Sequence, residues 1–119
     1  MDKNKVKITM EDGGEIVVVL DEKNAPLSVE NFRALVERRF YDGLIFHRVI
    51  DGFMAQTGCP YGTGTGGSGK KLKAEFNQVP HKRGTVSMAR SMLPDSADSQ
   101  FFICFGDCDW LNGQYTVWG

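Results

Sequence analysis

The stretch FHRVIDGFMAQTG, residues 46–58, places a charged side chain inside an apolar segment. Arg48 stands between Phe46 and the pair Val49 and Ile50, and apolar residues resume after a turn. A guanidinium stays charged in a protein, so burying it among such neighbours costs free energy unless acceptors surround it. We therefore expect hydrogen-bond acceptors around Arg48 and a structural or functional reason for its charge.

The length of the turn decides which residue faces Arg48, because directly opposed residues of a hairpin share one face of the sheet. A two-residue turn would place Ala55 opposite Arg48. A three-residue loop over residues 51–53 places Gln56 there instead. Because this register offers the guanidinium an amide oxygen, the sequence predicts the three-residue loop.

The first third of the chain predicts a β-hairpin followed by a helix. Apolar and polar residues alternate over residues 6–10, and an apolar run follows at residues 16–20. The Asp12-Gly13 pair between them supplies the positive φ angles of a tight turn. In VENFRALVERR, residues 29–39, apolar side chains recur at helical spacing. This spacing predicts an amphipathic helix, with Ser28 as its N-cap.

Short β segments dominate the remainder, and strands are expected at residues 46–50, 54–58, 85–89 and 100–105. One helix among many short strands indicates a mainly β fold, either a barrel or a folded antiparallel sheet. The length and the apolar fraction of 41% fit one globular domain over residues 1–119.

The segment QFFICF, residues 100–105, is apolar on both faces. Alternation separates its side chains into two sets, namely Gln100, Phe102 and Cys104 on one face and Phe101, Ile103 and Phe105 on the other. One face can fill the interior, and the other can line a pocket in which a small apolar ligand lies beside Arg48. The alternative is a structural Arg48 tied to Gln56 and backbone carbonyls, and spacing alone favours that alternative.

Composition argues against several classes of partner. The formal net charge of −1 gives no basic field for nucleic acid. The longest apolar run, residues 16–20, is too short to span a membrane, and the N-terminus does not resemble a signal peptide. Three widely spaced cysteines suit a reducing compartment, and no metal site is expected at Cys104 and Cys108, which have no histidine nearby. We expect a cytoplasmic protein.

The glycine-rich segment GTGTGGSGKK, residues 62–71, partly matches two phosphate-binding patterns. A phosphate loop needs a strand before it, a helix after it and a Ser or Thr after its lysine, where this chain has Lys71. Pro80 follows before a useful helix can form. We interpret the segment as a mobile surface loop whose glycines bring backbone close to a neighbour or a ligand.

Five segments in order, FHRVIDGFMAQTG, GTGTGG, GTVSMAR, SADSQFFICF and DWLNGQYTVWG, closely resemble the cyclophilin-type peptidyl-prolyl isomerases. The resemblance extends from about residue 6 to residue 119. It implies a closed antiparallel β-barrel with capping helices and a proline-binding groove on its outer surface. It also implies catalysis of rotation about Xaa-Pro bonds, with proline-containing peptides and unfolded or folding proteins as partners and with no cofactor.

The matching motifs imply a role for each site residue. Arg48 would be the catalytic arginine. The pocket for the proline ring would be formed by Phe53, Met54, Phe102 and Leu111. Gln56 would hold Arg48 and contact the peptide, and further peptide contacts would come from Ala89, Arg90, Gln100 and Tyr115. Trp110 matches the tryptophan associated in the family with cyclosporin binding, so the resemblance implies drug sensitivity.

The chain departs from the usual family pattern at several points. Tyr115 stands where many members have a histidine, as in some bacterial members, and Arg90 replaces a common asparagine. Family chains usually continue past the segment matching TVWG into a second helix and a strand that pairs with the first, whereas Gly119 is the last residue here. We therefore expect a barrel incomplete at its C-terminal end and self-association through the open edge.

Two other functions remain open. A non-catalytic module that binds proline peptides would use the same groove, and an incomplete barrel favours this alternative. A general folding helper would shield apolar segments of proline-free clients, but no feature of the sequence supports it specifically. Loss of Arg48 separates the isomerase from the binding module. In an isomerase it should abolish catalysis and spare much of the binding of the proline ring.

Overall fold

The computed structural model describes residues 4–119 and contains six strands, one α-helix and one 3₁₀ helix. The elements in chain order are β1 (Lys5–Thr9), β2 (Glu15–Val19), α1 (Pro26–Glu37), β3 (Arg48–Ile50), β4 (Met54–Thr57), β5 (Val86–Met88), β6 (Phe101–Cys104) and the 3₁₀ helix η1 (Asp109–Leu111). No helix in this part of the chain is both long and apolar enough to cross a membrane.

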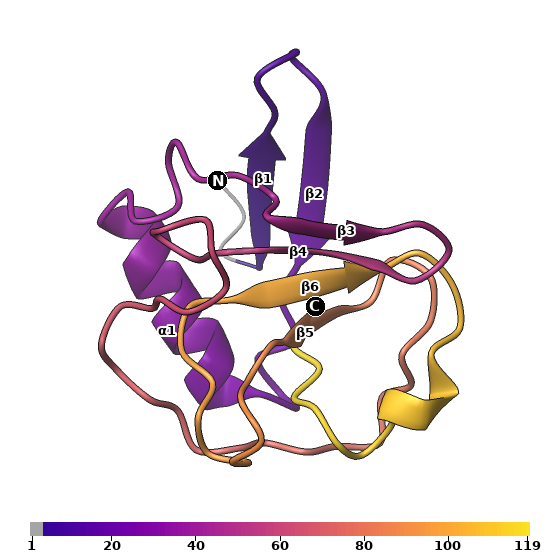
Figure 1. Ribbon diagram of the computed structural model, residues 1–119. Helices are drawn as coiled ribbons and strands as arrows, with labels where there is room; N and C mark the ends of the chain where they lie inside the picture. The colour runs from indigo at the N-terminus through magenta and orange to yellow at the C-terminus, as the bar shows by residue number, and fades with distance from the viewer. Residues whose placement is uncertain (1–3) are drawn as a thin grey trace.

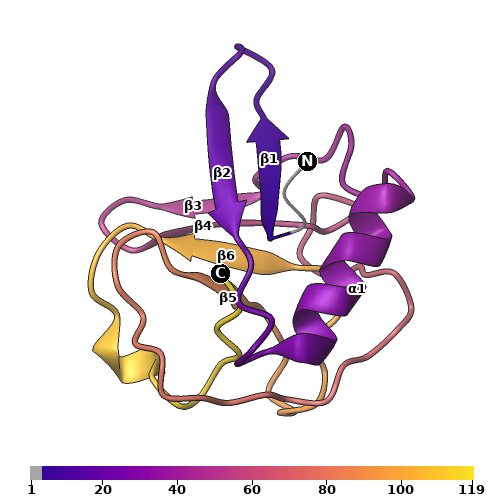
Figure 2. The same cartoon turned by 180° about the vertical axis from the view of Figure 1, so that it is seen from behind.

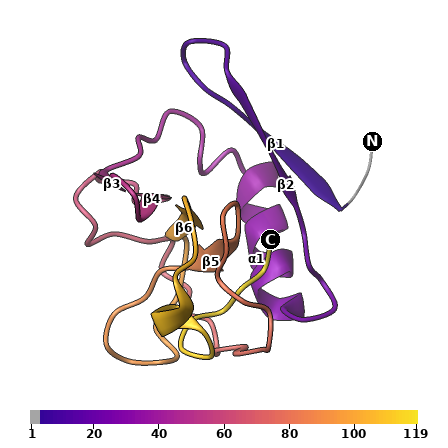
Figure 3. The ribbon, with the colours of Figure 1, turned by 90° about the vertical axis from the view of Figure 1, so that its right-hand side faces the viewer.

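The strands form two antiparallel sheets. β1 and β2 make a two-stranded hairpin that stands away from the four-stranded sheet, whose order is β3-β4-β6-β5 (Figure 1). From behind, α1 lies beside this sheet, with the hairpin above it (Figure 2). In the side view, β5 and β6 lie between α1 and the β3–β4 pair (Figure 3). The fold is therefore mainly β, with one α-helix on one side.

The hairpin of β3 and β4 has the register that the sequence predicts. Arg48 faces Gln56, and Ile50 faces Met54. The backbone N–H of Phe53 donates to the carbonyl of Ile50 at 3.0 Å, which closes the three-residue loop. The prediction of this loop over the two-residue turn is confirmed.

The main hydrophobic core lies between α1 and the inner face of the four-stranded sheet. Phe32 of α1 contacts Phe101 of β6 edge-on, with ring centroids 5.5 Å apart, and Trp118 at 4.4 Å. Phe102 belongs instead to a second buried cluster on the other face. The predicted alternation along residues 100–105 therefore separates the core from a pocket-lining face, as expected for a strand covered on both sides.

Residues 116–119 connect the two sheets. The N–H of Val86 in β5 donates to the Gly119 carbonyl at 2.9 Å, and the N–H of Asp21, which follows β2, donates to the Trp118 carbonyl at 2.8 Å. Within residues 4–119 the strands do not form a continuous ring, so the closed barrel that the resemblance implies is not observed in this part of the chain.

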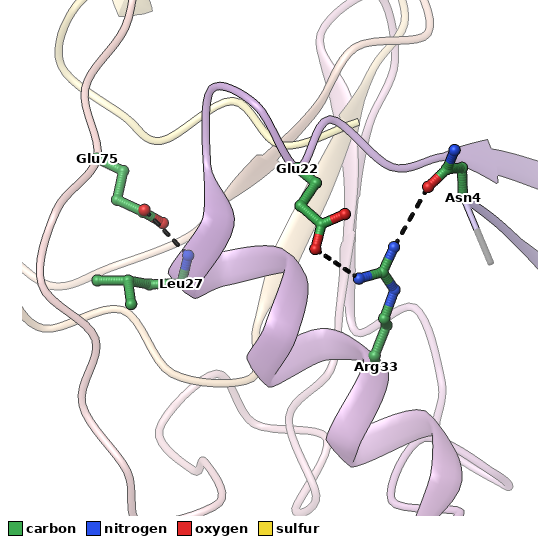
Figure 4. A network of polar contacts seen from close by, with 5 residues as sticks. All are labelled: Asn4, Glu22, Leu27, Arg33 and Glu75. Carbon is green, nitrogen blue, oxygen red and sulfur yellow. Dashed lines mark hydrogen bonds and ion pairs between the residues drawn. The ribbon is translucent and has the colours of Figure 1, made fainter.

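The N-terminus of α1 is capped from a distant part of the chain. The prediction of Ser28 as the N-cap is wrong: the helix begins at Pro26, after Ala25, and no N-cap side chain makes a hydrogen bond. Proline fits this first position because its missing N–H would have no helical partner there. The carboxylate of Glu75 instead accepts a hydrogen bond from the N–H of Leu27 at 3.0 Å (Figure 4). It also accepts one from the N–H of Ser28 at 2.8 Å.

A second polar contact ties α1 to the β1–β2 hairpin. Arg33 forms an ion pair with Glu22 at 3.0 Å and donates to the side chain of Asn4 at 3.4 Å (Figure 4). Both partners lie close to ends of the hairpin strands. The helix is thus held by Glu75 at its start and by Arg33 in its middle.

Replacing Glu75 by alanine should lower the free energy of unfolding by about 1–2 kcal/mol, because the first helical N–H groups lose their acceptor and the helix dipole loses a favourable charge. Urea denaturation measures this change. Glu22→Ala is the matched control, since it removes a more exposed carboxylate beside the same helix and should cost at most about 0.5 kcal/mol. Equal losses in the two variants would contradict the capping role.

Candidate active site

A cavity of about 130 Å³ lies on the outer face of the four-stranded sheet. Its lining residues are Arg48, Phe53, Met54, Gln56, Ala89, Arg90, Phe102, Leu111 and Tyr115. All but two of the site residues named from the sequence therefore line one cavity, although they are spread over more than half of the chain. The two others, Gln100 and Trp110, lie at its margins.

The sheet register aligns the polar and apolar parts of this cavity. Gln56 lies between Arg48 on one neighbouring strand and Phe102 on the other, so the three residues form a row across the sheet. Residues in such a row point to the same face. The row therefore runs from a cation through an amide to an aromatic ring.

Apolar side chains form the floor of the cavity. Met54, Phe102 and Leu111 are 3%, 5% and 9% exposed and belong to one buried cluster. Leu111 comes from η1, which brings a residue distant in sequence against β4 and β6. Phe53 and Tyr115 pack at the margin of this cluster. The floor of the cavity is therefore apolar and belongs to the packed core.

Arg48 is exposed, and the hydrogen-bond acceptors expected around its guanidinium are not observed in the described part of the chain. β3 is an edge strand, and all three of its residues are exposed, so the guanidinium extends into solvent at the cavity margin. In the described part of the chain no hydrogen bond joins Arg48 to Gln56. The Gln56 amide instead donates to Oε1 of Gln100 at 2.9 Å. The guanidinium donors are therefore available to a ligand.

Arg90 covers the outer wall of the cavity. Its guanidinium lies 4.7 Å from the ring centroid of Tyr115 and 5.7 Å from that of Phe76. It also donates to the carbonyl of Gln114 at 2.7 Å. These contacts fix the guanidinium against the aromatic ring. The Arg90 side chain in the cavity wall is therefore fixed by contacts within the protein.

A second cavity of about 250 Å³ adjoins the first and shares Gln56, Ala89 and Arg90 with it. The glycine-rich loop forms its other side, together with Gln100, Lys71 and Asp98. Lys71 and Asp98 are not among the site residues expected from the sequence, and no spacing signal points to them. The prediction that the loop glycines approach a neighbour is confirmed, because the Gly64 and Gly66 carbonyls accept hydrogen bonds from Gln100.

The family model described as cyclophilin type peptidyl-prolyl cis-trans isomerase matches residues 5–119. The chain belongs to this family. A peptidyl-prolyl cis-trans isomerase of Helicobacter pylori is 53% identical over 108 residues, and peptidyl-prolyl cis-trans isomerase B of Bacillus subtilis is 48% identical over 112 residues. These matches cover 89% and 92% of this chain.

The chain spans 66% of the length of the Helicobacter pylori relative and 78% of the Bacillus subtilis relative. A crystal structure of a Cryptosporidium parvum cyclophilin, determined in the presence of the dipeptide Ala-Pro, superposes with a TM-score of 0.90 at 35% identity. That match covers 97% of this chain and 76% of the other. The arrangement of strands and helix in this chain is therefore a cyclophilin fold.

Trp110 stands at the rim of the cyclophilin cavity. Its side chain is 66% exposed, and its ring centroid lies 5.7 Å from that of Phe53. Tyr115 contacts Phe102 edge-on at 5.8 Å, so it provides an aromatic wall of the cavity.

Buried cysteines lie beneath the cavity floor. Cys104 and Cys108 are each 1% exposed and pack in the same cluster as Met54. Burial and the neighbouring Cys108 raise the pKa of the Cys104 thiol to about 12. These cysteines act as small core side chains.

His81 supports the floor from behind. It is fully buried, and its ring stacks on Phe102 at 6.0 Å. Its Nε2 lies 2.9 Å from the Ser87 hydroxyl and its Nδ1 lies 3.1 Å from Oδ1 of Asn112. Burial lowers the pKa of His81, and the hydrogen bond to Asn112 opposes this effect only in part.

The lowered pKa of His81 predicts a loss of stability in mild acid. Below the ordinary histidine pKa of 6.5 the unfolded chain binds a proton that the folded chain refuses, so this contribution is complete above pH 6.5 and declines as pH falls. The free energy of unfolding, measured in urea at pH 7.5 and 5.5, should fall by up to about 1.4 kcal/mol per pH unit. His81→Gln should flatten this dependence, and an unchanged slope would contradict the assignment.

Proposed function

We propose that the protein is a peptidyl-prolyl cis-trans isomerase that acts at the cavity of about 130 Å³. The observation that carries the proposal is the position of Arg48, which lines the same cavity as the buried apolar floor of Met54, Phe102 and Leu111. The family membership and the printed names of the relatives support it. So does the Ala-Pro dipeptide present with the Cryptosporidium parvum cyclophilin.

Rotation about an Xaa-Pro bond makes and breaks no covalent bond. Amide resonance opposes it with a barrier of roughly 18–20 kcal/mol, so the uncatalysed change takes tens of seconds or longer. In the twisted state the proline nitrogen loses conjugation and gains lone-pair character. A donor directed at this nitrogen binds the twisted state more tightly than either planar state, which is the condition for catalysis. The reaction therefore requires no cofactor.

Arg48 supplies this donor in the proposed mechanism. A guanidinium carries five N–H groups, cannot be deprotonated and lies here at the edge of the cavity. The floor of Met54, Phe102 and Leu111 holds the proline ring while the preceding carbonyl rotates. Gln56, beside Arg48, contacts the peptide backbone, and Ala89, Arg90 and Gln100 flank the residues that precede the proline.

The partners of this reaction are proline-containing peptides and unfolded or folding proteins in the cytoplasm, with neither nucleic acid nor membrane involved. The net charge of −1 supports this assignment. We also propose that the exposed indole of Trp110 at the cavity rim contacts cyclosporin. Competition between cyclosporin and an Ala-Pro peptide tests this point.

We propose further that the two sheets belong to a β-barrel whose closure involves the free edge of β1. β1 pairs only with β2 among the described residues, so one of its edges can accept another strand. The same edge supports the proposal of self-association. Lys5 and Lys7 on β1 oppose close pairing of two copies, so we expect any such association to strengthen with salt.

A non-catalytic module for proline peptides is the second candidate. One observation favours it: Gln56 donates to Gln100 and leaves the Arg48 side chain without a hydrogen bond that would fix it in the described chain. A donor that is not held in place contributes less to catalysis, because part of its benefit is lost in ordering it on binding.

Exchange spectroscopy by NMR separates the two candidates. A peptide with one Ala-Pro bond, at fifty times the protein concentration, should show cis/trans exchange cross-peaks when the protein is present. The same peptide in buffer alone should show none. A binding module would shift the peptide resonances without producing exchange. That outcome, with a folded protein, would refute the isomerase.

A further inference from the structure

Gln100 does not have its amide N–H groups free for a ligand. Its Nε2 donates one hydrogen to the Gly64 carbonyl at 2.9 Å and the other to the Gly66 carbonyl at 2.8 Å. Its Oε1 accepts from Nε2 of Gln56 at 2.9 Å. Both ends of the amide are therefore occupied by residues of this chain.

These partners determine the orientation of two amides in succession. Two carbonyl oxygens can be satisfied only by an NH₂ group, so the nitrogen of Gln100 must face the glycine loop. Its oxygen then faces Gln56 and can be satisfied only by the nitrogen of that amide. Oε1 of Gln56 is left without a donor among residues 4–119, and Gln56 lines both cavities. This oxygen is the acceptor that the site offers to a peptide N–H or to Arg48.

The loop that holds Gln100 is itself held by a cysteine. The N–H groups of Gly64 and Gly66 each point to Sγ of Cys59 at 3.3 Å. Cys59 is 1% exposed and follows β4, the strand that carries Gln56, after one intervening residue, Gly58. Burial alone would raise the pKa of the Cys59 thiol, but hydrogen bonds from backbone N–H groups, that of Gly66 foremost, lower it to about 6.

The position of Cys59 is fixed by its neighbour. Gly58 has a φ of +94°, and a Cβ there would lie 2.3 Å from the Ser99 carbonyl oxygen. The chain can pass this close to the start of β6 only with glycine. The Ser99 hydroxyl donates to the Gly58 carbonyl at 2.7 Å and closes the contact. The segment of Gly58 and Cys59 is thus attached both to β4, which carries Gln56, and to the residues just before β6, where Gln100 lies.

We propose that Cys59 is a positioning residue of the peptide site, which fixes the Gly64–Gly66 carbonyls, through them Gln100, and through Gln100 the amide oxygen of Gln56. The inference rests on the proposed function for its kinetic consequence. The hydrogen-bond relay itself is a property of the free protein.

Two variants of Cys59 isolate the sulfur as an acceptor. Cys59→Ala removes it and should lower kcat/KM about fivefold, mainly through a higher KM, because one hydrogen-bonded contact with the peptide is no longer positioned. Cys59→Ser keeps an acceptor for the two glycine N–H groups and should restore at least half of the loss. A residue that only fills space would show the reverse order, since alanine disturbs packing less than an unmatched hydroxyl.

A double-mutant cycle with Gln100→Leu tests the coupling. Gln100→Leu breaks the relay at its other end and should lower kcat/KM about tenfold. If both residues act through one relay, adding Cys59→Ala should lower it by less than a further twofold. A combined loss near fiftyfold, the product of the single effects, would overturn the proposal.

Side-chain amide resonances of Gln56 and Gln100, recorded without peptide, decide the matter independently of activity. We expect Cys59→Ala to shift the side-chain amide resonances of both glutamines and Cys59→Ser to leave them near the parent positions. If Cys59→Ala does not fold, Gln100→Leu replaces it and should shift the amide resonances of Gln56. Parent-like resonances in a folded Cys59→Ala protein would overturn the relay. If the variants shift these resonances as expected but the parent protein does not catalyse exchange, the relay stands and only the proposed isomerase is refuted.

Discussion

Arg48→Ala should lower kcat/KM for an Ala-Pro peptide by about 10²–10³-fold, the range found when one preorganised donor to a transition state is removed. The dissociation constant for the peptide should change much less, because the proline ring rests on Met54, Phe102 and Leu111. Exchange spectroscopy gives the rate, and a titration followed by chemical shifts gives the affinity. The split between the two distinguishes a catalytic donor from a binding contact.

Arg48→Lys is the control for charge without geometry. Lysine keeps the positive charge but presents one ammonium in place of the planar fork, so its activity should fall between those of the parent and the alanine variant. Neither change should alter the free energy of unfolding by more than about 0.5 kcal/mol, because Arg48 is exposed. Parent-like catalysis by Arg48→Ala would remove Arg48 from the mechanism.

Trp118→Ala should have the largest effect on stability, about 3–5 kcal/mol, which is the usual cost of deleting a buried large aromatic side chain. The indole is fully buried and packs against Phe32 at 4.4 Å and Phe101 at 5.4 Å. Its backbone also joins Val86 of β5 to Asp21, two residues after β2. Urea denaturation followed by circular dichroism measures the loss, or shows an unfolded chain without denaturant.

Trp118→Phe separates packing from polarity at the same position. The indole Nε1 is buried and has no hydrogen-bond partner among residues 4–119, so phenylalanine removes an unsatisfied donor while keeping an aromatic ring. The two effects oppose each other, and we expect a cost below about 1.5 kcal/mol. A cost as large as that of alanine would mean that Nε1 has a partner in solution.

The local pattern of the sequence was sufficient for the hairpin and for the two faces of β6. The β3–β4 register followed from pairing Arg48 with Gln56, and the separation of Phe101 from Phe102 followed from the two-residue period of a strand. Both depend on neighbours in the chain. The motif resemblance then indicated which distant residues share the cavity, and the structure brings all but Gln100 and Trp110 into its lining.

Contacts between distant segments could not be predicted from such patterns. Glu75 caps a helix that begins 49 residues earlier, at Pro26, and nothing in the sequence around it indicates this role. The exposure of Arg48 follows from the edge position of β3, which depends on strand order. The glycine loop was interpreted correctly as a close approach, but its partners, Cys59 and Gln100, are known only from the structure.

The most direct test of the account is to locate the proline ring while exchange is being catalysed. A peptide with a ¹³C-labelled proline in its Ala-Pro bond, in excess over the protein, allows intermolecular NOEs from the ring to be assigned. We predict NOEs to the Phe102 ring and to the Met54 and Leu111 methyl groups, together with exchange cross-peaks that Arg48→Ala removes. Catalysed exchange with ring NOEs confined to another part of the surface would contradict the assignment of this cavity as the active site.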